Sequence, residues 1–188
     1  GDVSVLWFDE YYHDLVHLSP EQRAAVNFDH PDSLDEVLLI EHLDGLLAGR
    51  PVDVPVYDFA THTRTGLTRR VEPRPVVVVD GILVLAVPAL RSRLDLAVFV
   101  DAPAEVRLAR RMYRDVRERG RTTASVRAQF EATVAPMHEA FVDPSAEHAD
   151  LRLDGTGDLD ANLDVVADAL ERLRLGTCPL GRRESRPR

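Results

Sequence analysis

The stretch from residue 110 to residue 121 holds the side chains of this sequence that are best suited to bind phosphate. It contains six arginines, although the formal net charge of the chain is −9. Planar guanidinium groups match phosphate oxygens in shape and charge, and Gly120 predicts that a helix ends or bends inside the stretch. These features indicate a mobile clamp on a polyphosphate. The alternative is a solvated helix face whose arginines pair with Asp115, Glu118 and Glu105.

Three aspartates follow apolar runs that are typical of buried strands. Asp9 follows residues 3–8, Asp80 follows four valines, and Asp101 follows residues 96–100. Ligands of an open α/β sheet bind at the carboxyl ends of its strands. We therefore expect Asp9 to orient or deprotonate an attacking hydroxyl and Asp80 to lie near Mg²⁺. A turn or capping role is the competing interpretation, because turns favour aspartate.

Two polar segments also carry aromatic rings, and recognition of a nucleobase needs both stacking surface and hydrogen-bonding groups. In residues 27–32, Asp29 could hold sugar hydroxyls, whereas Asp32 is better interpreted as the start of the next helix. Residues 55–64 combine rings with several donors and acceptors. A loop histidine such as His62 is, taken alone, more often structural than ligand-binding.

The composition narrows the functional class. At 188 residues the chain is long enough for one domain with a substantial core. Its one cysteine, Cys178, excludes an internal disulfide framework and predicts a cytoplasmic protein. No apolar run has the length of a membrane span, and the acidic balance argues against a nucleic-acid binder. All 23 basic residues are arginine, so Schiff-base lysines and the phosphate-loop motif GxxxxGK(S/T) are absent from these residues.

Hydrophobic periodicity predicts strands that alternate with helices, which indicates an α/β fold with an open, mostly parallel sheet. Ser33 and Glu36 have the spacing of a capping box at the start of a helix that stops at Gly49. The valine run is typical of a strand covered on both faces. Strands are expected at 3–8, 76–79, 96–100 and 149–153, helices at 103–117, 123–141 and 159–174, and an irregular hairpin at 52–72.

Taken in order, these segments resemble the uridine–cytidine kinases of the phosphate-loop kinase superfamily. The most specific motifs are NFDHPD at 27–32, PVYDF at 55–59 and ERGR at 118–121, and the resemblance runs from about residue 4 to residue 155. It implies a phosphate-loop kinase fold with helices on both faces of the sheet, a β-hairpin for the nucleoside and an arginine-rich lid. It also implies ATP (or GTP) as donor, Mg²⁺, and small-molecule partners without nucleic acid or membrane, and it leaves a homo-oligomer open.

The resemblance implies a role for each matching residue. Asp29 and Arg111 hold the ribose hydroxyls, and Tyr57 and His62 read the polar edge of the pyrimidine. The residues expected around the nucleoside are Tyr12, Phe28, Asp29, Tyr57, Phe59, His62, Arg111 and Gln129. The residues expected at the reacting groups are Asp9 on the 5′-hydroxyl, Asp80 in the Mg²⁺ shell, and the lid arginines Arg114, Arg119 and Arg121.

The sequence departs from the family at its start. The family begins with a strand, a glycine-rich phosphate loop and a helix, so we expect a segment of roughly 30–45 residues of this kind before Gly1. Its strand would lie between the strands at 76–79 and 96–100, whose backbone edges need a partner. A lesser departure is Asp80, where the family more usually has glutamate. On this interpretation residues 1–176 form a single nucleoside-kinase-like domain and residues 177–188 a flexible tail.

Three functions compete. The first is ATP-dependent phosphorylation of uridine or cytidine at the 5′-hydroxyl, a step of pyrimidine salvage. The second is a related kinase, phosphoribulokinase-like or pantothenate-kinase-like, but the segment at 55–62 favours a pyrimidine. The third is a non-catalytic nucleoside-binding protein, because the phosphate loop is absent from these residues.

Overall fold

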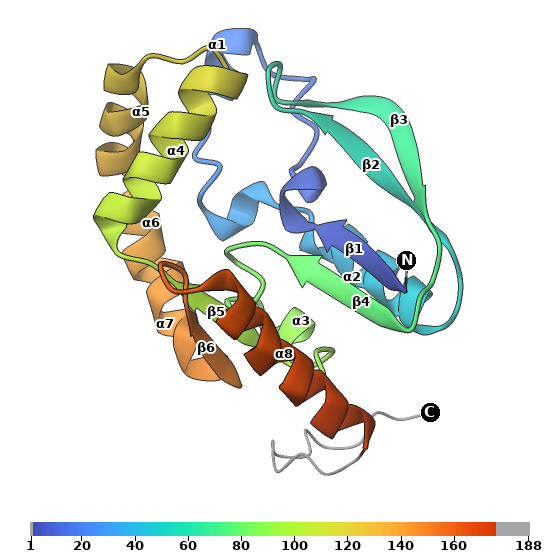
Figure 1. Cartoon of the computed structure of the whole chain (residues 1–188). Helices are drawn as coiled ribbons and strands as arrows, with labels where there is room; N and C mark the ends of the chain where they lie inside the picture. The colour runs from blue at the N-terminus through green and yellow to red at the C-terminus, as the bar shows by residue number, and fades with distance from the viewer. Residues whose placement is uncertain (1, 176–188) are drawn as a thin grey trace. The chain divides into compact units, whose positions relative to one another are not determined.

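A computed structural model of the chain describes residues 2–175 and forms two compact units, which join between Val84 and Leu85. Each unit contains one parallel pair of strands, and the first also contains an antiparallel hairpin (Figure 1). The predicted α/β class with parallel strands and helices is therefore confirmed. That residues 1–176 form a single domain stays a prediction, and the predicted tail lies outside the described residues.

The parallel pair of the first unit joins β1 (Val3–Trp7) to β4 (Val76–Asp80), with Trp7 opposite Asp80. Strands place alternate side chains on opposite faces. In β1 the side chains of Ser4 and Leu6 are buried, whereas Val3 and Trp7 are exposed. The observed bounds of β1 and β4 agree within one residue with the strands predicted at 3–8 and 76–79.

The antiparallel hairpin consists of β2 (Val52–Asp58) and β3 (Thr63–Val71). Its register shifts between Pro55 and Tyr57, which is a β-bulge. The prediction of an irregular hairpin at 52–72 is confirmed.

The helix α2 (Glu36–Leu47) buries Leu39, Leu43 and Leu46 and contacts β2. Its N-cap is Asp35, whose carboxylate accepts a hydrogen bond from the amide of Leu38. The predicted cap at Ser33 or Asp32 is therefore wrong. Pro31–Ser33 form a short 3-10 helix instead. The described residues do contain a capping box, formed by Ser19 and Gln22 at the start of the short helix α1 (Pro20–Ala24), which sequence analysis missed.

The second unit contains the parallel pair β5 (Val98–Asp101) and β6 (Leu151–Asp154). Its helices are α3 (Pro88–Arg91), α4 (Ala104–Glu118), α5 (Thr123–Gln129), α6 (Ala135–Met137), α7 (Asp143–Ser145) and α8 (Leu159–Arg174). The segment predicted as one helix at 123–141 is helical throughout but contains two wider π-type turns, Phe130–Val134 and His138–Val142.

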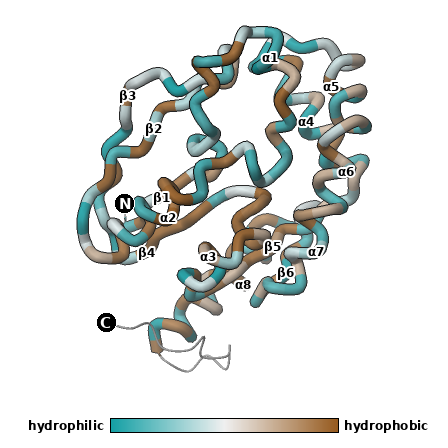
Figure 2. The backbone as a smooth tube through the Cα atoms, turned by 180° about the vertical axis from the view of Figure 1, so that it is seen from behind, coloured by the Kyte–Doolittle hydropathy of each residue, from teal (hydrophilic) through white to brown (hydrophobic). Residues whose placement is uncertain are grey.

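The expectation that the valine strand is covered on both faces is wrong for the described residues. Figure 2 shows β4 as a hydrophobic stretch, yet Val78 is 41% exposed, and Val100 of β5 is 60% exposed. In each parallel pair both strands have an outer edge without a hydrogen-bonded neighbour among residues 2–175. Within this part of the chain, none of the helices is long and apolar enough to span a membrane.

Candidate active site

The carboxyl ends of β1 and β4 lie side by side and bring two predicted acids to one edge of the sheet. Trp7 is opposite Asp80, and Asp9 follows two residues later in a short 3-10 helix, Phe8–Tyr11. The approach is close, because a Cβ added to Gly81 would lie 2.4 Å from the Cβ of Phe8. Asp9 and Asp80 are both exposed. Their predicted positions at the ends of neighbouring strands are confirmed, whereas their chemical roles stay predictions.

The residues that follow Asp9 are anchored to the rest of the unit. Glu10 forms an ion pair of 2.7 Å with Arg69, whose guanidinium lies over the ring of Trp7. The hydroxyl of Tyr11 lies 3.0 Å from Nδ1 of His42. Burial raises the pKa of Tyr11 and lowers that of His42, which favours the neutral form of both side chains. These anchors fix the backbone that carries Asp9.

Five of the predicted nucleoside residues form one aromatic cluster in the first unit. Tyr12 contacts Phe28 and Tyr57 at ring-centroid distances of 5.2 Å and 5.4 Å. His62 stacks on Phe28 at 4.5 Å with an interplanar angle of 16°. Tyr57 also contacts Phe59 edge to face. The sequence predicted that these rings gather, and the structure places them in contact.

The hydroxyl group of Tyr57 is the unusual atom of this cluster. The residue is 6% exposed, and its hydroxyl has no hydrogen-bond partner among the described residues. Burial raises the pKa of Tyr57 to about 12, so the group is a neutral donor. A buried polar atom without a partner costs about 1–3 kcal/mol. Such an atom suits a site in which a ligand supplies the missing hydrogen bond.

His62 is held in place by the hairpin turn. Its φ is 56°, the left-handed region that a residue other than glycine rarely adopts. Its amide donates to the carbonyl of Asp58, and the Asp58 carboxylate accepts from the amide of Ala60 and the hydroxyl of Thr61. Strained backbone of this kind clusters at ligand sites. The turn thereby presses the His62 ring onto Phe28.

Arg64 joins the hairpin to the segment that follows β1. Its guanidinium donates to the carbonyl of Tyr12 at 3.1 Å and forms an ion pair of 3.1 Å with Asp35, the N-cap of α2. Sequence analysis included Arg64 only as the last residue of the segment 55–64 and did not predict this link. The only feature of the sequence that pointed to this link was the position of Arg64, two residues after His62.

The loop that carries Asp29 is fixed locally. The amide of Asp29 donates to the side chain of Asn27, and the hydroxyl of Ser33 donates to the carbonyls of Phe28 and His30. Asp29 itself is half-buried. The loop leads directly into the aromatic cluster through Phe28, while the role of Asp29 at the ribose stays a prediction.

The predicted lid residues gather in the second unit. Gln129 accepts hydrogen bonds from Arg111 and Arg121. The carboxylate of Asp115 is fully buried, and it forms ion pairs with Arg111, Arg114, Arg119 and Arg121. The alternative interpretation, a solvated helix face, correctly predicted that Asp115 pairs with arginines, but the Asp115 carboxylate is buried and not solvated.

No cluster of three or more metal-binding side chains occurs in residues 2–175. Proteins usually hold Mg²⁺ with one or two carboxylates together with substrate phosphates and water. The exposed carboxylate of Asp80, beside the end of β1, fits that requirement.

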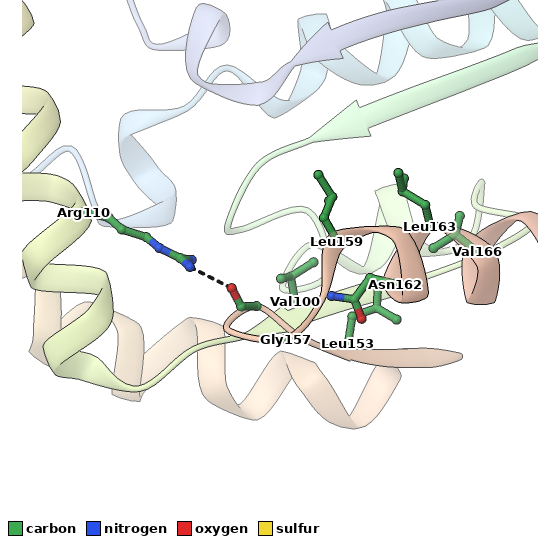
Figure 3. A pocket seen from close by; sticks show the side chains of 9 residues that line it. Val100, Arg110, Leu153, Gly157, Leu159, Asn162, Leu163 and Val166 are labelled. Atoms are coloured by element: carbon green, nitrogen blue, oxygen red, sulfur yellow. Dashed lines mark hydrogen bonds between the residues drawn. The ribbon is translucent and has the colours of Figure 1, made fainter.

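A hollow of about 370 Å³ opens at the carboxyl end of the β5–β6 pair (Figure 3). It is lined mostly by apolar side chains of β5, β6 and α8, among them Val100, Leu153 and Leu163. Arg110 lies at its rim and donates to the carbonyl of Gly155 at 2.8 Å. An apolar hollow with a few polar groups at its rim can hold a flat ring. Sequence analysis did not predict it.

The predicted site residues thus divide between the two units. The first unit holds Asp9, Tyr12, Phe28, Asp29, Tyr57, Phe59, His62 and Asp80, and the second holds Arg111, Arg114, Arg119, Arg121 and Gln129. Within each unit the structure brings the predicted groups together.

Comparison of the sequence with known proteins gives a consistent result. Residues 2–161 match the sequence model of the Phosphoribulokinase / Uridine kinase family. A uridine kinase of Chloroflexus aggregans is 50% identical over 163 residues, which cover 87% of this chain and 78% of the relative. A uridine kinase of Klebsiella pneumoniae subsp. pneumoniae is 43% identical over 164 residues, which cover 87% and 77%.

Solved structures show the same fold. A candidate fructose transport system kinase from Silicibacter sp. TM1040 superposes with a TM-score of 0.60 at 19% identity, covering 80% of this chain and 74% of that structure. A candidate P-loop kinase with a circular permutation, from Saccharomyces cerevisiae, gives a TM-score of 0.56 at 13% identity, with coverages of 84% and 59%.

Proposed function

Because the chain belongs to the phosphoribulokinase/uridine kinase family, we propose that this kinase transfers the terminal phosphate of ATP to the 5′-hydroxyl of uridine or cytidine. The observation that carries the proposal is the Tyr57 hydroxyl, buried without a partner in a cluster of stacked rings. A pyrimidine offers both the ring face and the polar edge that this cluster can use. Phosphoribulose and pantothenate offer no aromatic face.

Phosphoryl transfer requires mainly positioning and neutralisation of charge. Asp9 orients the 5′-hydroxyl and accepts its proton, since it lies exposed on an anchored backbone at the strand end. Asp29 holds the ribose, next to the ring of Phe28. The lid arginines neutralise the phosphates, and Asp80 would hold Mg²⁺, which would neutralise further negative charge of the donor.

The hollow beside α8 suits the base of the donor nucleotide. Its apolar lining and the rim residue Arg110 support this part of the proposal. Leu163 is exposed, so Leu163→Arg should fold normally. In that variant the KM for ATP should rise while the KM for uridine stays unchanged. A change in both constants, or in neither, would remove the assignment.

The proposal is tested by assaying the purified protein with ATP, Mg²⁺ and a panel of acceptors. We expect the monophosphates of uridine and cytidine as products. Phosphorylation of ribulose 5-phosphate or pantothenate instead would favour the related kinases. Uridine binding without any phosphorylation would favour a nucleoside-binding protein.

A further inference from the structure

Asp115 is the point at which the arginines of the second unit meet. It lies on α4, and its side chain is 0% exposed. Nε of Arg114 donates to it at 2.9 Å. The remaining contacts are longer, between 3.5 Å and 3.7 Å, and come from Arg111, Arg119 and Arg121.

The same residue also holds the turn after α4. The carbonyl oxygen of Asp115 accepts hydrogen bonds from the amides of Arg119 and Arg121, each at 3.2 Å. The residue between them, Gly120, has a φ of 62°, which lets the chain reverse there. Asp115 therefore fixes the backbone of two lid arginines with its carbonyl group and gathers their side chains with its carboxylate.

Geometry indicates that Asp115 gathers these guanidinium groups and leaves donors for an external anion. A carboxylate offers about four acceptor positions, and a guanidinium offers five donors. Arg114 contacts Asp115 through Nε alone, so the other N–H groups of its guanidinium remain for another acceptor. The Arg114 and Arg119 side chains are 45% and 36% exposed, so an external anion can reach them.

We propose that Asp115 is a positioning residue, whose buried carboxylate converges the four guanidinium groups on the place where the donor phosphates bind. Asp115 contacts neither substrate nor metal in this role. The inference rests on the proposed kinase function. The observed arrangement of the arginines around Asp115 does not depend on that function.

A test follows from the sign of the charge effect. Removing a negative charge near an anion site should strengthen anion binding by Coulomb's law alone. Positioning predicts the opposite for Asp115→Asn, because guanidinium groups that repel one another would no longer converge. The matched control is Glu118→Gln, which removes the same charge from an exposed position of the same helix.

The probe is inorganic tripolyphosphate, measured by calorimetry at low salt with the full chain. We expect Asp115→Asn to bind it about tenfold more weakly, and Glu118→Gln to bind it as well as or better than the unchanged protein. Asp115→Glu keeps the charge and should recover part of the affinity. Unchanged or tighter binding by Asp115→Asn would overturn the proposal.

Phosphorylation kinetics of the protein supply the second readout. Asp115→Asn should lower kcat by about 10–100-fold, with the KM for uridine within about twofold of the unchanged protein. If Asp115→Asn changes the Mg²⁺ concentration that the reaction requires, Asp115 is a metal ligand and the positioning role is overturned.

If Asp115→Asn does not fold, the affinity of Asp115→Glu for tripolyphosphate decides. In that variant the carboxylate is displaced, so full retention of tripolyphosphate binding would contradict a positioning role. If the unchanged protein phosphorylates no nucleoside, the proposed function fails, while the binding test still judges Asp115.

Discussion

At the scale of single residues, Tyr57 gives the sharpest test of the substrate, because stability and binding should respond in opposite directions. Tyr57→Phe deletes a buried hydroxyl that has no partner in the described residues. The melting temperature should stay unchanged or rise, since the unpaired group no longer costs desolvation energy. The KM for uridine should rise by about tenfold, which corresponds to the ~1–3 kcal/mol of a lost buried hydrogen bond.

The control for that experiment is Tyr113→Phe, at an exposed tyrosine of α4. It should leave both quantities unchanged. A lower melting temperature for Tyr57→Phe together with an unchanged KM would show that the hydroxyl serves the fold.

Asp9 should control the rate of transfer and have little effect on nucleoside binding. Asp9→Asn keeps the shape of the side chain but removes the proton acceptor, so kcat should fall by about 10²–10⁴-fold. The dissociation constant of uridine, measured by calorimetry, should change no more than a few-fold. Asp160→Asn, at an exposed position of α8, is the matched control. If kcat of Asp9→Asn falls by less than about tenfold, Asp9 does not orient or deprotonate the 5′-hydroxyl.

At the scale of elements, the contact between the ends of β1 and β4 depends on Gly81. An added Cβ would lie 2.4 Å from the Cβ of Phe8, so Gly81→Ala forces the two strand ends apart. We expect a loss of about 1–3 kcal/mol in the free energy of unfolding, measured by denaturant titration, and a lower kcat because Asp9 moves with Phe8.

The comparison variant is Gly157→Ala, whose Cβ would lie 3.2 Å from its nearest neighbour, a carbonyl oxygen. Its effect on stability should be smaller. If Gly81→Ala is as stable as the unchanged protein, the close approach does not constrain the strand ends.

The lid arginines should affect the donor more than the nucleoside. Arg121→Ala removes one guanidinium from the cluster at Asp115 and one hydrogen bond to Gln129. We expect the KM for ATP to rise and kcat to fall, since developing phosphate charge loses a donor. Arg117→Ala is the control, because Arg117 contacts the exposed Tyr113 instead. A selective rise in the KM for uridine would contradict the lid assignment.

Sequence analysis predicted the bounds of helices and strands well where the local sequence pattern determines them. It failed where contacts with distant residues determine them. The strands and the hairpin follow from β-branched runs. The start of α2 does not follow from local pattern, because a bridge between Tyr12 and Leu34 and the ion pair of Arg64 with Asp35 shift its cap two residues beyond Ser33. Likewise, the wider helical turns after α5 each precede a proline, which cannot donate to the regular helical ladder.

The site shows the same division. Its rings and acids were predicted from motifs, because each motif carries its own chemistry. Asp115 was considered only as a partner that pairs with solvated arginines. Its full burial depends on the fold of α4 and α5 around it, which no local pattern reveals.

At the scale of the whole molecule, each unit contains a histidine whose protonation opposes folding. Burial lowers the pKa of His42 in the first unit and of His138 in the second from the ordinary value of 6.5. The unfolded chain therefore binds more protons than the folded chain in this range. Stability should be complete above about pH 6.5 and should fall as the pH drops through the lowered values.

Melting temperatures at pH 7.5 and pH 5.5 test this expectation. The unchanged protein should melt lower at pH 5.5, and His42→Gln, which keeps an acceptor for Tyr11, should lose part of the difference. His17→Gln, at an exposed histidine, should keep all of it. A protein that melts higher at pH 5.5 would contradict the sign.

The unequal protection of the strand edges also bears on how this chain behaves in concentrated solution. Charged side chains on an edge strand discourage pairing between molecules, and β3 carries Arg64, Arg69 and Arg70. The four valines of β4 offer no such guard, and β4 pairs with one strand only among residues 2–175. The strand β1 is in the same position, because it pairs only with β4 and carries no charged side chain. Self-association of these residues should therefore begin at the β1–β4 pair, and Val78→Arg should delay it.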